Sequence, residues 1–93
     1  MNQSIERTAL TNLITNEDYA KKVLPFIKKD YFDGREEKII FEEITNFVDK
    51  YKKIPTGHAL EIEVGERKDL TETEYKKIVD IIQTLSPTDV DFD

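Results

Sequence analysis

The sequence of 93 residues has no cysteine, no tryptophan, one histidine, three glycines and three prolines. Without cysteine the chain forms neither disulfides nor thiolate metal sites, which is compatible with a reducing cytoplasm, the localisation we expect. The glycines stand singly, so neither a dinucleotide-binding fingerprint nor the GxxxxGK[ST] phosphate-binding loop is present. We therefore expect this chain to bind no cofactor.

Long apolar runs are also missing. No segment approaches the ~20 apolar residues that span a membrane, and the N-terminal MNQSIERTAL lacks the basic start and apolar core of a secretion signal. With 38% hydrophobic and 37% charged residues, the chain is too apolar for a disordered tail and too charged for a membrane protein. Its length predicts one domain with one modest core.

The net charge of −6 is unevenly distributed. Residues 1–53 hold ten basic and ten acidic side chains, whereas residues 54–93 hold four basic and ten acidic. Nucleic-acid binding depends on basic side chains that displace counterions from phosphates. We therefore expect no direct contact with nucleic acid and favour a partner protein with a basic surface.

The N-terminal third shows two segments with helical spacing. Its first apolar stripe consists of Ile5, Ala9, Leu10, Leu13 and Ile14. Asn2 or Ser4 is the expected cap of this helix, because a short side-chain oxygen accepts from the free N–H groups at a helix start. Asn16 is the expected cap of a second helix, which Pro25 ends or kinks.

The middle of the chain predicts the longest helix. Phe26 and Ile27 are expected to anchor the turn before it, and Asp33 with Glu36 is expected to form its capping box. Its apolar face comprises Ile40, Phe41, Ile44, Phe47, Val48 and Tyr51. Ile39 does not fit this face and is expected to point outward among polar residues.

Two more helices are expected towards the C-terminus. Thr56 is the expected cap of the first, although residues 59–64 also alternate like a strand. We favour a short helix ending near Gly65, because a lone strand has no partner for its backbone groups. Thr71 and Glu74 form a Thr-x-x-Glu capping box that begins the last helix.

These elements predict an all-α fold, a compact bundle of about five short helices. Residues 1–86 form the expected globular domain, and Ser86-Pro87 is expected to stop its last helix. Residues 87–93 form an acidic tail that resembles the first turn of a further helix, cut short.

No catalytic or metal-binding constellation is found. His58, the single histidine, lies in an expected helix start without a nucleophile or acid beside it. Carboxylate pairs occur at Glu36-Glu37, Glu42-Glu43, Glu61/Glu63 and Glu72/Glu74. We interpret them as helix starts and polar faces where solvent treats both members alike, so their pKa values are not separated for acid and base roles.

Exposed apolar side chains are the expected functional feature. Tyr31 and Phe32 lie in a connector, Ile39 lies off its helix face, and Ile81 lies at the edge of the last one. On a small domain, exposed apolar groups often mark partner contacts. For Tyr31, Phe32 and Ile39 we favour burial under a loop, because a small core needs aromatic anchors, and a contact surface is the alternative.

The order and spacing of several segments resemble one family. The segments are ALTNLITNEDYAKKVLPF, the DYF connector, IIFEEITNFVDKY, IPT and LTETEY. Together they resemble the N-terminal domain of hexameric, DnaB-like replicative DNA helicases, in particular those of tailed bacteriophages. The resemblance extends from about residue 5 to residue 85.

The resemblance implies a non-catalytic, all-helical collar above an ATP-driven motor ring. Sister helicase subunits and a primase or helicase loader would be its partners, in the host-cell cytoplasm. The parent helicase would use ATP and Mg²⁺, but the family's ATPase residues have no counterparts in this sequence. The alternative from the residues alone is a stand-alone acidic helical adaptor or inhibitor that binds a basic partner protein.

Overall fold

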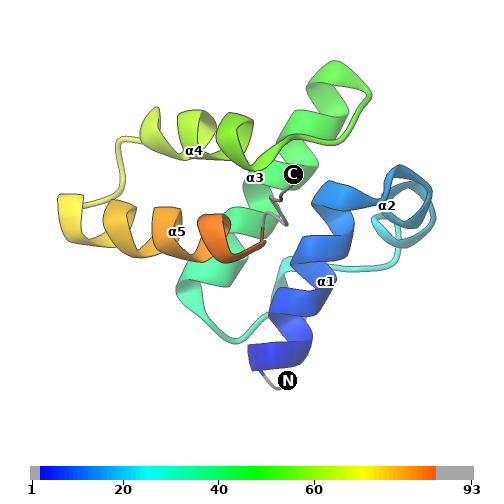
Figure 1. Ribbon diagram of the computed structural model, residues 1–93, viewed down its shortest axis with the longest axis horizontal. Helices are drawn as coiled ribbons and strands as arrows, with labels where there is room; N and C mark the ends of the chain where they lie inside the picture. Colours follow the sequence, from blue (N-terminus) through cyan, green and yellow to red (C-terminus); the bar gives the residue numbers. More distant parts are fainter. Residues whose placement is uncertain (1–2, 86–93) are drawn as a thin grey trace, which may run out of the picture.

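The computed structural model describes residues 3–85, with side chains from Ile5 onward. The elements are α1 (Gln3–Thr15), α2 (Glu17–Val23), the short 3-10 helix η1 (Lys29–Tyr31), α3 (Arg35–Tyr51), α4 (Gly57–Gly65) and α5 (Glu72–Leu85). No strand occurs in residues 3–85. The predicted all-α bundle of about five short helices is confirmed (Figure 1).

Helix α3 is the centre of the bundle. It packs against α1, α4, α5 and η1, while α2 packs mainly on α1, and α4 on α5 (Figure 1). The side chains that α3 shares with its neighbours form one hydrophobic core, which includes Leu10, Leu13, Phe32, Ile39, Ile40, Ile44, Leu60, Val64, Ile78, Ile82 and Leu85. Burial of this shared apolar surface stabilises helices too short to be stable alone.

Short-range helix signals were confirmed at two starts. The side chain of Asn16 accepts a hydrogen bond from the N–H of Tyr19 at 3.0 Å, and Thr56 accepts one from Ala59 at 3.0 Å. Each bond satisfies an N–H group that has no partner within its helix. Residues 59–64, which alternate like a strand in the sequence, are helical, and this helix ends at Gly65 as expected.

The expected capping of α3 by Asp33 and Glu36 was wrong. The N-cap is Gly34, and no side chain bonds to the first turn from that position. The backbone N–H of Asp33 instead donates to the carboxylate of Glu6 at 3.3 Å, which ties the connector to α1. Helix α3 begins at Arg35, one residue later than expected. The carboxylate of Glu37 lies so close to Gly34 that a side chain at position 34 would overlap it.

Two expectations for α1 also need correction. Ser4 lies inside the helix and is not its cap, and Asn2 lies outside the described residues. Ile5 is 52% exposed rather than part of the core. The inward side of this first turn is occupied by Glu6, which is 1% exposed and bonded to the connector, so Ile5 lies to the outside. The expected Ser86-Pro87 stop and acidic tail also lie outside the described residues.

The capping box of α5 is present in both directions. The N–H of Thr71 donates to Glu74 at 3.0 Å, and the N–H of Glu74 donates to the Thr71 hydroxyl at 3.1 Å. The backbone hydrogen bond from Thr71 lowers the pKa of Glu74 below its ordinary value of 4.5, with a further contribution from Arg35 and opposition from burial. The ionised carboxylate is therefore the form that the folded state favours.

We expect this capping box to make stability depend on acid pH. Because the folded-state pKa of Glu74 is the lower one, its contribution is present above pH 4.5 and is lost as pH falls through the folded-state value. Glu74→Gln keeps the capping geometry but removes the charge. In urea denaturation, the wild type should be more stable than the variant at neutral pH, and the difference should shrink on acidification.

Glu72→Gln is the matched control for this series. Glu72 lies in the same first turn of α5 but makes no capping bond in the described structure. A difference between the wild type and Glu74→Gln that stays constant from neutral to acid pH would contradict the prediction.

Candidate functional site

The four predicted contact residues do not form one exposed surface. Phe32 is fully buried, Ile39 is 5% exposed and Ile81 is 9% exposed, whereas Tyr31 is 37% exposed. The expectation that Ile39 points outward was wrong, because α3 is covered by helices on several sides and its apolar face is correspondingly wider. Burial was favoured for Tyr31, Phe32 and Ile39, and it holds for Phe32 and Ile39; Ile81 is buried as well.

The structure places other apolar side chains at the surface. Phe26 is 84% exposed and Ile62 is 50% exposed, and Tyr51 at the end of α3 is 44% exposed. Phe26 was expected to anchor its turn, but only Ile27 packs on the core. The apolar run around Pro25 could have signalled a contact segment, but its spacing does not say which residue is outside.

A hollow of about 460 Å³ lies between the α2 segment and α3. We call it the α2–α3 hollow; it is lined by Ala20, Lys21, Leu24, Pro25, Thr45, Val48 and Asp49. It is mainly apolar, with Lys21 on its α2 side and Asp49 on its α3 side. It exists because α2 packs chiefly on α1 and leaves this part of α3 uncovered.

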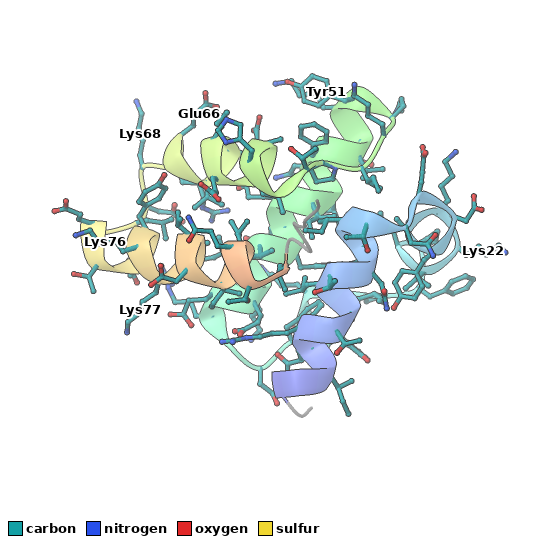
Figure 2. All side chains as sticks on the ribbon, viewed as in Figure 1. Lys22, Tyr51, Glu66, Lys68, Lys76 and Lys77 are labelled. Carbon is teal, nitrogen blue, oxygen red and sulfur yellow. The ribbon has the colours of Figure 1, made fainter. Side chains whose placement is uncertain are left out.

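A second surface lies on the outer face of α4. Ile62 is half exposed there, and His58 and Glu66 lie one turn before and after it on the same face of the helix. Figure 2 shows Glu66 pointing away from the body of the domain. This α4 face therefore combines an apolar side chain with an acidic one, and the single histidine is exposed rather than aligned with a nucleophile.

An arginine network fixes the connection between α4 and α5. The guanidinium of Arg67 donates to Glu43 at 2.7 Å and, with two nitrogens, to Asp69 at 3.0 and 2.9 Å. Its pKa is raised, chiefly by the bond to Asp69 and against the effect of burial, and the same bond lowers the pKa of Asp69. Glu43 is 8% exposed, so this contact ties a nearly buried carboxylate of α3 to the connection.

Carboxylate neighbours do not share the same environment, which corrects the sequence interpretation. Glu37 is 1% exposed and Glu36 is half-buried. Glu37 pairs with Arg7 at 3.4 Å, across the contact of α1 with α3. No periodicity signals such burial, because it depends on which helix lies opposite. The contacts of Glu37 and Glu43 are structural, since each joins two elements of the chain.

Within residues 3–85, no group of three or more histidine or acidic side chains could hold a metal ion. In the same range, no helix has the length and apolar character needed to cross a membrane. A separate cleft is lined by Lys29, Arg35 and Arg67, among others. Each of these three side chains already pairs with a carboxylate.

Similarity to known proteins indicates the kind of protein to which such a domain belongs. No protein-family model matches the chain. The chain is similar to the DnaB-like replicative helicase of Enterobacteria phage T4, with 32% identity over 82 residues. The similarity supports a relationship to helicases.

The match covers only a small part of the T4 helicase, which limits the conclusions about function. The aligned residues make up 88% of this chain but only 17% of the T4 helicase. The chain thus spans a small part of that protein, and nearly all of the bundle takes part in the match. The helicase's activity as a whole does not follow from this partial match.

Proposed function

We propose that this chain is the non-catalytic N-terminal domain of a phage replicative DNA helicase. Its role is to support subunit assembly and to contact a primase or helicase loader during DNA replication. The observation that carries the proposal is a match that covers 88% of the chain and 17% of a DnaB-like helicase. An all-helical bundle without a phosphate-binding loop suits an assembly domain better than a motor.

The α4 face is the contact that best suits a primase or loader. An exposed apolar side chain beside carboxylates favours a partner surface that offers an apolar pocket with basic groups around it. Ile62 would supply the apolar contact, and Glu66 the charge. This arrangement agrees with the acidic balance of residues 54–93.

Binding to the primase and to the loader of the same replication system tests this function. We expect saturable binding of the 93-residue chain to one of them by isothermal titration calorimetry. Ile62→Arg should raise the dissociation constant by about tenfold or more, because it replaces an apolar contact by a charge that a basic surface repels. Gln83→Arg adds the same charge at an exposed position of α5 and should bind like the wild type.

Failure to bind either protein would contradict the contact role. Binding that Ile62→Arg and Gln83→Arg weaken equally would reject the α4 face but not the function. The reading frame beyond Asp93 distinguishes the helicase domain from the stand-alone adaptor. A downstream GxxxxGK[ST] loop supports a helicase parent, and a stop codon directly after Asp93 favours the acidic adaptor.

A further inference from the structure

The α2–α3 hollow is a mainly apolar depression that the proposed contact through α4 leaves unused. Leu24 and Pro25 supply apolar lining from the α2 segment, and Val48 supplies it from α3. Leu24 and Val48 also pack against the hydrophobic core, so the fold itself holds the lining in place. The volume of about 460 Å³ lies within the size range of binding pockets, about 300–1,000 Å³. A large apolar side chain of a partner can therefore enter it.

The chain around this hollow is locally basic, in contrast to the net charge of −6. Residues 19–29 hold four lysines and no acidic side chain. Lys21 lines the hollow, and its ion pair in the described structure is an exposed one with Glu17, at 3.5 Å. Lys52 is the exposed C-cap of α3, one turn after Val48, and it forms no ion pair in the part of the chain that the structure describes. Cations are thus available to a partner on both sides of the hollow.

We propose that the α2–α3 hollow binds a short acidic segment of another protein, in which carboxylates flank one large apolar side chain. The apolar side chain enters the hollow, and the carboxylates pair with Lys21 and Lys52. Phe26 follows Pro25 without lining the hollow, and its exposed ring offers the same segment a second apolar contact. The apolar contacts are needed because exposed ion pairs by themselves contribute little.

The chemistry of the hollow favours a protein segment over a nucleic acid. Single strands bind in positively charged grooves and stack their bases on aromatic side chains. The residues that line this hollow include no aromatic ring, and Asp49 lies among them. The net charge of −6 also repels a polyanion more than it repels a segment with a few carboxylates. The proposal goes beyond the contact with primase or loader and does not depend on it, since its residues come from the α2 segment and α3 rather than α4.

Titration with a defined peptide tests the proposal. The probe is the acetylated and amidated peptide GDDFDDG, and the control peptide has serine in place of phenylalanine. Amide chemical shifts of the isotope-labelled 93-residue chain report where each peptide binds. We expect saturable shifts at the residues that line the hollow and at Lys52, but not on α4. The serine peptide should bind about tenfold or more weakly, because it lacks the side chain that enters the hollow.

Three single substitutions of exposed residues assign the charges. Lys21→Glu should weaken binding of the phenylalanine peptide by about fivefold or more, because it replaces an attraction by a repulsion. Lys22→Glu is the matched control, since Lys22 points outward from α2 and does not line the hollow (Figure 2). It should change the affinity by about twofold or less. Asp49→Asn should tighten binding by about twofold or more, because it removes the carboxylate that lines the hollow.

Four results would overturn the proposal. They are peptide shifts that do not saturate up to millimolar concentration, and equal weakening by Lys21→Glu and Lys22→Glu. The third is a twelve-nucleotide oligothymidylate that binds the same residues more tightly than the peptide, which would make a nucleic acid the occupant. The fourth is a set of shifts at these residues when the chain alone is concentrated, which would make a second copy the occupant. A chain that fails to bind the peptide but binds primase or loader would reject this site and leave the proposed function intact.

Discussion

Phe32→Ala should lower the free energy of unfolding by about 3–5 kcal/mol, the typical cost of removing a buried aromatic ring. Phe32 is fully buried, and its ring centroid lies 5.3 Å from that of Tyr31 and 5.1 Å from that of Phe41. The substitution leaves a cavity where the connector meets α3. Because small domains have a total stability of about 5–15 kcal/mol, the variant should be partly unfolded at physiological temperature.

Urea denaturation followed by circular dichroism measures this loss. Tyr31→Ala is the matched control, since it removes the adjacent ring in the same connector but at a position that is 37% exposed. We expect it to cost about 1 kcal/mol or less. If Phe32→Ala kept wild-type stability and instead weakened binding to a partner, Phe32 would be a contact residue and the structural interpretation would be wrong.

Arg67→Ala should lower the free energy of unfolding by about 2–3 kcal/mol. Within the described residues, Arg67 provides the ion pair of Glu43, which is 8% exposed, so the substitution leaves a nearly buried carboxylate without its cation. It also removes the two-nitrogen bond to Asp69 that holds the α4–α5 connection. An unpaired buried charge costs more than the pair contributes, since its desolvation is no longer compensated.

A double substitution tests whether the loss comes from the unpaired carboxylate. Glu43→Leu combined with Arg67→Met replaces the pair by apolar groups and should recover much of the loss that Arg67→Ala causes. Arg35→Ala is the control, because its bond to Glu74 at 3.1 Å is exposed and such pairs contribute about 0–1 kcal/mol. Equal losses for Arg35→Ala and Arg67→Ala would show that burial of Glu43 does not matter.

Helix starts were predictable wherever the signal is short-range. Asn16, Thr56 and the Thr71–Glu74 box were found from spacing alone, because each bond spans three residues of one helix. The start of α3 was not found in this way. There a longer-range bond competes, since the N–H of Asp33 donates to Glu6, 27 residues earlier in the chain.

The candidate contact surface was much less predictable than the fold. The spacing placed Ile39 outward and Phe26 as an anchor of its turn, whereas the structure buries Ile39 and exposes Phe26. Helical periodicity states which residues share a face but not how many neighbours cover it. For α3, helices on several sides bury Ile39. For Phe26, the position of α2 on α1 leaves the turn in solvent.

The sequence by itself determined the all-α class, most helix limits and the resemblance to helicases, because these depend on spacing within segments of a few turns. Only the tertiary structure decided that Glu6, Glu37 and Glu43 are buried, that Phe26 is exposed, and that Phe32 belongs to the core. Burial is a property of what lies opposite a side chain. In this bundle those neighbours come from helices distant in sequence, and local patterns carry no record of them.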